Sequence, residues 1–175
     1  MDNGSSDGTA AWLALEWPSS DGVALPSIRY FGGGNRSGVP TTMHDLLLFL
    51  NNDMQVKPGL FQALRDGFRG PDGVFDSTVF AVTAEVFFED PNKRREETGL
   101  TRVAAGATGF KPRHDIPTDA EKERPAVPCF WPGGGSSAVR KDLFRELRMF
   151  DPLYDPFYVE DLALGHAAWR RGLRN

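Results

Sequence analysis

The chain has 175 residues, of which 40% are hydrophobic and 25% are charged, and its net charge is −4. This length and hydrophobic content predict one folded domain with a buried core, which excludes a disordered chain. The acidic balance excludes a broad surface for a nucleic-acid backbone, so we expect no nucleic-acid partner. A small anionic ligand is compatible with it, because a metal ion and backbone amides can hold phosphates without a basic surface.

The N-terminal part of the chain is rich in turns and glycine. Asp7 can cap a helix predicted over residues 9–17. Residues 27–31 are predicted to form a strand. Three glycines and an asparagine follow at residues 32–35, and this composition predicts a loop with unusual backbone angles.

The middle of the chain holds its clearest strand. The apolar run Leu46–Leu50 is unbroken, which is typical of a central strand covered on both faces. Pro58 stands where the first turn of a helix is expected, and Leu60, Phe61 and Leu64 contribute the apolar face of that helix. Residues 79–88 form a second β-rich stretch.

Residues 89–123 are a long, charged segment containing prolines, which we interpret as an excursion from the core. The sheet is predicted to resume at residues 127–131. A glycine triplet at residues 133–135 then bends the chain into a strand at residues 136–139.

The C-terminal part is predicted to be helical. Helices are expected over residues 141–147 and 159–171, and Gly172 is expected to end the second of them. Strands that alternate with helices predict an α/β fold with ligands at the carboxyl ends of the strands.

The lone cysteine and the apolar runs bear on location. Cys129 has no partner for an intrachain disulfide, and we interpret it as a small buried hydrophobe. No apolar run approaches the ~20 residues of a membrane span, and no signal peptide precedes the polar start. We therefore expect a cytoplasmic protein, either free or peripheral at the inner face of the membrane.

Two groups of polar residues stand where chemistry is expected. Asn51 and Asp53 follow the apolar strand, where Asp53 suits a Mg²⁺ or Mn²⁺ ligand and Asn51 can bond ribose or metal-bound water; ordinary turn chemistry is the alternative. Glu160 and Asp161 open the last helix after a run of aromatics. In a partly apolar pocket a carboxylate there can act as a general base, although acidic residues also favour a first helical turn for electrostatic reasons alone.

Read together, five segments resemble the motifs of family 2 glycosyltransferases in their order along the chain. The matching segments are DNGSSDGT at residues 2–9 (family pattern DNxSxDGT), FGGGNRSG at 31–38 (FAxGxNxG), LFLNND at 48–53 (a variant of the metal-binding DxD motif), GGGSSA with Arg140 at 133–140 (GGxSA…R), and FD with FYVEDL at 150–162 (FDExF…yxED). They cover nearly the whole chain.

The resemblance implies a GT-A-like, Rossmann-related fold, a mostly parallel sheet flanked by helices. It implies inverting transfer of a sugar from a nucleotide-diphosphate donor (a UDP-, dTDP- or GDP-sugar) to a hydroxyl of a saccharide or lipid-linked acceptor. Asp161 would be the base, with Glu160 beside it orienting or binding acceptor, and Asp53 would bind the metal. The remaining implied roles are nucleotide-sugar contacts by Asp2, Asn35, Asn51 and Asn52, and acceptor-side positions at Trp131, Gly134 and Gly135.

Compared with the family, the chain is expected to be a partial catalytic domain spanning residues 1–175. The family's first strand and helix would precede Asp2, and its closing region would follow Asn175. We divide the chain into a nucleotide-sugar part at 1–56, the excursion at 89–123 and an acceptor-side part at 126–175. A sheet that lacks its first strand exposes an edge through which a second copy could pair.

Two other functions fit the residues. The first is a non-catalytic remnant of the same fold that binds nucleotide or a protein partner. The second is a serine hydrolase, because Ser136 lies in a near match to the nucleophile elbow and His44, His114 and His166 are available as bases.

Overall fold

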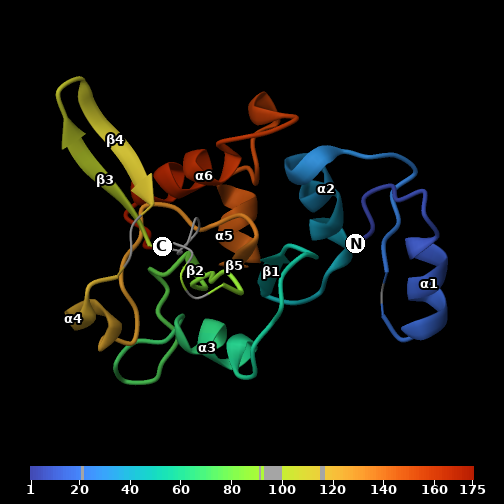
Figure 1. Cartoon of the computed structure of the whole chain (residues 1–175), viewed down its shortest axis with the longest axis horizontal. Coiled ribbons are helices and arrows are strands. Elements are labelled where there is room, and N and C mark those ends of the chain that lie inside the picture. Colours follow the sequence, from blue (N-terminus) through green and yellow to red (C-terminus); the bar gives the residue numbers. More distant parts are fainter. Residues whose placement is uncertain (21, 91, 93–99, 115–116) are drawn as a thin grey trace.

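The computed structural model describes residues 1–20, 22–90, 92, 100–114 and 117–175. Within these ranges the protein is mixed α/β, with helices packed around small antiparallel sheets (Figure 1). The mostly parallel sheet that the resemblance implies is not seen among the described strands, because β1, β2 and β5, like β3 and β4, pair antiparallel. None of the helices in the described ranges is both long and apolar enough to cross a bilayer.

The main sheet has three strands in the order β1 (Leu46–Leu50), β5 (Ser136–Arg140), β2 (Ala81–Thr83). β5 is antiparallel to both neighbours, and Ala138 is paired with Leu48 on one side and with Val82 on the other. β1 and β2 therefore run in the same direction on either side of β5. Two isolated bridges, Asp2 with Ala24 and Val79 with Arg174, are parallel.

The strand predicted at Leu46–Leu50 is confirmed, but its predicted central place is wrong, because β1 is the first strand in the order of the described sheet. Its apolar run has a different cause. Phe49 belongs to the core on one face, and Leu46 and Leu48 pack on the cluster of the other face. An edge strand that is covered on both faces has the same unbroken apolar sequence as a central strand.

Helices cover both faces of this sheet (Figure 1). α5 (Lys141–Glu146) and α6 (Glu160–Trp169) lie over one face, and α3 (Leu60–Asp66) over the other. α5 and α6 match the predicted helices to within two residues at each end. α3 begins two residues after Pro58 and buries Leu64, but Phe61, predicted on its apolar face, is 63% exposed. The larger core contains Phe49, Phe80, Val139, Phe144, Phe150 and Leu164, and the smaller contains Leu64, Phe68, Val79 and Ala138.

The N-terminal part forms α1 (Thr9–Glu16), α2 (Tyr30–Gly38) and the 3₁₀ turn η1 (Val39–Thr41). α1 was predicted, but its N-cap is Gly8 and not Asp7. The Asp7 carboxylate, one residue earlier, accepts hydrogen bonds from the backbone and hydroxyl of Thr9 at 3.0 and 2.6 Å. α1 has no buried residue. It therefore owes little of its stability to packing.

The strand predicted at residues 27–31 and the loop predicted at 32–35 are both wrong, because α2 occupies most of this stretch. The glycines allow close packing of a helix: a Cβ on Gly34 would lie 2.9 Å from the Asn3 side chain, and one on Gly32 3.2 Å from Arg36 and from Asp155. Such contacts between distant segments outweigh the poor helix propensity of glycine.

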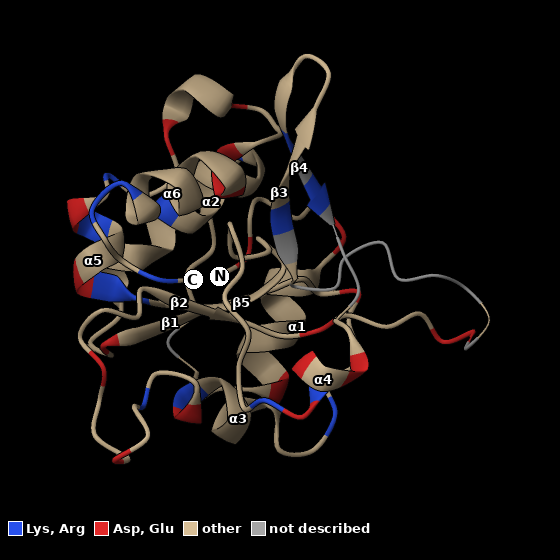
Figure 2. Ribbon diagram, turned by 90° about the vertical axis from the view of Figure 1, so that its left-hand side faces the viewer, with Lys and Arg blue, Asp and Glu red and all other residues tan. Residues whose placement is uncertain are grey.

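The excursion contains a β-hairpin, β3 (Thr101–Gly106) with β4 (Gly109–His114), followed by the short helix α4 (Asp119–Lys122). The hairpin projects from the body, and basic residues lie on both of its strands (Figure 2). An ion pair joins Arg102 to Glu121, whose side chain completes the capping box of α4 with Thr118. The backbone hydrogen bond from Thr118, followed by the bond from Arg102, lowers the pKa of Glu121 to about 2. Part of the predicted excursion, residues 91, 93–99 and 115–116, lies outside the described residues.

Two further β predictions need correction. Residues 127–131 form no strand, because the backbone of Cys129 donates to the carbonyl of Asn175 at 2.9 Å instead of joining the sheet. Of the β-rich stretch 79–88, only Ala81–Thr83 is a strand. The C-terminus is as predicted in one respect, since Gly172 follows α6 with a φ of +74°, a conformation that favours glycine.

Candidate functional site

The ends of β1 and β2 lie beside the start of β5, because β5 runs against both. The backbone amide of Asn51 donates to the carbonyl of Gly135 at 2.9 Å, and the backbone amide of Gly133 donates to the hydroxyl of Thr83 at 3.3 Å. The predicted DxD-like turn and the predicted glycine triplet are therefore neighbours at one edge of the sheet.

Asp161 and Phe31 reach the same edge from two helices. The backbone amide of Gly134 donates to the Asp161 carboxylate at 3.3 Å. A Cβ on Gly134 would lie 3.0 Å from the Phe31 ring, and one on Gly135 would lie 2.6 Å from the Asn51 side chain. Both glycines are thus required by the close approach of neighbours, and the edge gathers residues from four segments that are distant in sequence.

Glu160 and Asp161 lie in the first turn of α6, after Val159, whose φ is +87°. The Glu160 side chain is buried, at 8% exposure, and its Oε2 has no hydrogen-bond partner among the described residues. Burial raises the pKa of Glu160, and the negative charges of Asp161 and Asp155 raise it further. Asp161 is less buried and accepts a second hydrogen bond, from the Leu162 amide at 2.7 Å. The two carboxylates therefore differ in environment.

Because Glu160 binds its proton more tightly in the folded state than in the unfolded state, its ionisation destabilises the fold as the pH rises above the ordinary value of 4.5. We expect Glu160→Gln to raise the melting temperature at pH 7, because glutamine carries no charge to be buried. The gain should vanish at about pH 3, well below the ordinary value of 4.5, because the wild-type carboxyl is then protonated in both the folded and the unfolded state. A thermal scan across pH checks this, and a gain that is equal at both pH values would contradict it.

The predicted nucleotide-side residues Asp2 and Asn35 are engaged locally. Asp2 is buried, and its Oδ1 accepts hydrogen bonds from the backbone and hydroxyl of Ser5 at 3.2 and 2.5 Å. The Asn35 side chain donates to the Phe31 carbonyl at 3.0 Å, one turn earlier in α2. Asn35 lies on a helix and not in the predicted loop.

Asn52 and Asp53 form the exposed turn after β1. Among the described residues no group of three or more His, Cys, Asp or Glu side chains is placed to hold a metal ion. A single exposed carboxylate at Asp53 fits a cation that takes most of its ligands from a bound diphosphate and from water, as Mg²⁺ commonly does.

Trp131, predicted on the acceptor side, is buried at 5% exposure. A Cβ on Gly165 would lie 2.5 Å from its Cα, so Trp131 packs directly beneath α6. Trp131 therefore supports the helix that carries Asp161, and little of the Trp131 surface is left to contact a ligand.

Ser136 is placed poorly for a nucleophile. It is the first residue of β5, it is buried, and its hydroxyl donates to the Ala84 carbonyl at 3.3 Å. A nucleophile elbow requires an exposed serine at a turn from strand to helix. His44 and His166 are both exposed, and the side chain of His114 lies outside the described part.

Two residues that the sequence analysis did not single out, Asn3 and Arg36, connect the site. Asn3 accepts from the Arg29 amide and donates to the Tyr30 carbonyl, both at 2.9 Å, which fixes the start of α2. Arg36 donates to the Phe150 carbonyl at 2.8 Å and to the Asp155 carboxylate at 2.6 Å, which ties α2 to the segment before α6. Only the structure reveals these contacts, because each joins segments that are far apart in the chain.

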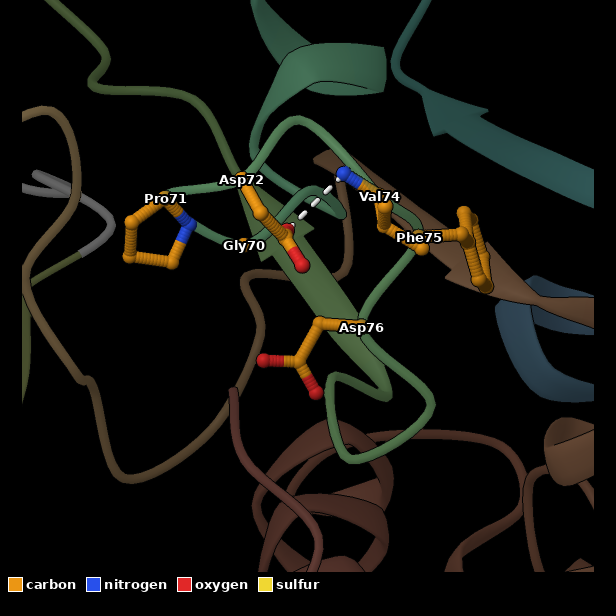
Figure 3. Close-up of a pocket in the computed structure, with 6 residues that line it drawn as sticks. All are labelled: Gly70, Pro71, Asp72, Val74, Phe75 and Asp76. Atoms are coloured by element: carbon orange, nitrogen blue, oxygen red, sulfur yellow. Dashed lines mark hydrogen bonds between the residues drawn. The ribbon is translucent and has the colours of Figure 1, made fainter.

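A separate hollow of about 360 Å³ lies in the loop after α3 (Figure 3). Its wall includes Asp72, which accepts a hydrogen bond from the Val74 amide at 3.0 Å, and Phe75. No residue predicted to be functional lines it. The sequence matches no protein-family model and no curated protein. Function is therefore inferred from the contacts at the sheet edge and from the order of the motifs along the chain.

Proposed function

We propose that the chain is the catalytic core of an inverting, nucleotide-sugar-dependent glycosyltransferase of the family 2 type, with a GT-A-like fold. The observation that carries the proposal is the convergence at one sheet edge of four motif residues, Phe31, Asn51, Gly134 and Asp161. If the four motifs resembled the family only by chance, their residues would not be expected to contact one another in the folded chain.

In the proposed reaction Asp161 is the general base. The acceptor hydroxyl attacks the anomeric carbon of the donor, its proton passes to the Asp161 carboxylate, and the bond from the anomeric carbon to the diphosphate oxygen breaks. The displacement inverts the anomeric configuration. The hydrogen bond from the Gly134 amide orients the Asp161 carboxylate toward the edge where Asn51 lies.

The donor diphosphate is proposed to lie beside the turn at Asn51–Asp53, with Asp53 as the protein ligand of Mg²⁺ or Mn²⁺. When bound, such a cation supplies charge stabilisation for the leaving diphosphate. Asn51 and Asn52 offer amide groups for hydrogen bonds to the ribose or the diphosphate.

Asp53→Ala should abolish the metal dependence of nucleoside-diphosphate binding and leave thermal stability nearly unchanged, because the Asp53 side chain is exposed. The measurement is calorimetric titration of UDP, dTDP and GDP with and without Mn²⁺. Asp45→Ala is the matched control, since Asp45 is an exposed aspartate at the opposite end of β1. Metal-dependent binding that persists in Asp53→Ala, or is lost equally in Asp45→Ala, would refute the assignment.

A further inference from the structure

Three exposed aromatic rings gather next to the candidate site. Tyr30, Phe157 and Tyr158 are 45%, 56% and 77% exposed. The rings of Tyr30 and Phe157 meet edge to face with centroids 6.2 Å apart, and those of Phe157 and Tyr158 lie 4.9 Å apart. The rings come from the start of α2 and from the segment before α6, so the cluster exists only in the folded chain.

The cluster is held in place on both sides. The Tyr30 carbonyl accepts a hydrogen bond from Asn3, and Tyr30 itself has a φ of +55°, which is uncommon for a residue with a side chain. The bond from Arg36 to Asp155 fixes the other segment immediately before Phe157. Rings that are already ordered lose little freedom when a ligand binds.

The cluster adjoins the proposed reaction centre. Tyr30 precedes Phe31, whose ring covers Gly134 beside Asp161. Tyr158 comes two residues before Glu160, which is the first residue of α6, the helix that also carries Asp161. A molecule lying on the rings would therefore have part of its length near Asp161.

The charge around the rings disfavours an anionic molecule. The segment from residue 151 to 161 contains four acidic residues and no Lys or Arg: Asp151, Asp155, Glu160 and Asp161. Of the arginines in this part of the chain, Arg36 is paired with Asp155, and the exposed Arg29 immediately precedes Tyr30, so the four carboxylates outnumber these two cations. An anionic ligand would meet repulsion at this surface.

We propose that Tyr30, Phe157 and Tyr158 form a binding site for the pyranose ring of a neutral saccharide, the acceptor of the transfer. This inference rests on the proposed function. The electron-rich face of an aromatic ring attracts the C–H groups on the flat side of a pyranose, and the hydroxyls around that ring keep their hydrogen bonds to water. The apolar, exposed and rigid rings suit such a partner.

The test is saturation-transfer NMR on the full chain, with cellotriose, maltotriose and chitotriose as neutral probes and trigalacturonate as the anionic one. The variants are Phe157→Ala, Tyr158→Ala and both together, and Phe110→Ala is the control because Phe110 is 80% exposed on the distant hairpin. We expect at least one neutral probe to bind. Each single variant should raise its dissociation constant roughly two- to tenfold, with no change in Phe110→Ala and weaker binding of trigalacturonate.

The proposal is overturned if no neutral probe binds the wild-type chain, if the double variant binds as well as Phe110→Ala, or if the anionic probe binds most tightly. Loss of vesicle binding or of self-association in the double variant, without saccharide binding to the wild type, would assign the rings to a membrane or to a second copy and also overturn it. Titration of UDP, dTDP and GDP into the same samples separates this failure from that of the proposed function. The double variant should bind nucleotide normally, whereas saccharide binding without nucleotide binding would retain the site and reject the transferase.

Discussion

Asp161→Asn is expected to lower the rate of sugar transfer by roughly 10²–10⁴ while donor affinity stays nearly unchanged. The amide has the shape of the carboxylate and keeps an oxygen for one of the two backbone donors, Gly134 or Leu162, but it cannot take the acceptor proton. The proposed donor contacts lie elsewhere, at the turn that holds Asn51 and Asp53. Release of nucleoside diphosphate, measured alongside donor titration, separates the two effects.

Two further variants make this result specific. Asp142→Asn is the control, because Asp142 is an acidic residue in the first turn of α5, away from the sheet edge. Glu160→Gln should give a milder defect, since neighbouring residues of a helix point about 100° apart and only one of the pair can face the reaction centre. If Asp161→Asn turned over donor as fast as Asp142→Asn, Asp161 would not be the base.

Phe150→Ala should cost about 3–5 kcal/mol of unfolding free energy, the range for removing a buried phenylalanine. Phe150 is 1% exposed, and its ring centroid lies 5.3, 5.2 and 5.1 Å from those of Phe31, Phe49 and Phe144. Its loss would leave a cavity between α2, β1 and α5. Urea denaturation followed by tryptophan fluorescence measures the difference.

Phe110→Ala is the matched control for this change, because it removes the same side chain from an exposed position on the hairpin. It should alter the unfolding free energy by no more than about 0.5 kcal/mol. If both variants were destabilised equally, the assignment of Phe150 to the core that joins α2 to the sheet would be wrong.

Elements with strong local signals were predictable from the sequence. The apolar run at Leu46–Leu50 became β1, and the helices around residues 60–66, 141–146 and 160–169 appeared where periodicity placed them. Gly172 has the backbone conformation expected after a helix. In each case the local pattern and the tertiary environment favour the same conformation.

Predictions failed where distant residues decide the local structure. Glycines 32–34 are buried in α2 because the side chains of Asn3, Arg36 and Asp155 occupy the space where their side chains would be. Residues 127–131 lie beside the C-terminal residue Asn175. The Cys129 amide donates to the Asn175 carbonyl, and the Asn175 side chain donates to the Phe130 carbonyl. Arg36 lies in α2 itself, but Asn3, Asp155 and Asn175 lie outside any local window of sequence around these segments.

The candidate site was predictable only through motif order. Taken one at a time, Asn51, Gly134 and Asp161 fit ordinary turns and helix starts, and their proximity could be expected only from the family resemblance. The ties made by Asn3 and Arg36 were not predictable, since a polar side chain gives no sign of which distant backbone it will bond.

The transfer reaction itself tests the central claim most directly. UDP-, dTDP- and GDP-sugars are incubated with Mg²⁺, the full chain and the neutral trisaccharides, and ¹H NMR follows the anomeric signals. We predict that one donor is consumed and that the new linkage has the anomeric configuration opposite to that of the donor, with this product lost in Asp161→Asn. A product that retains the donor configuration, or a folded chain that consumes none of the donors, would contradict the proposal.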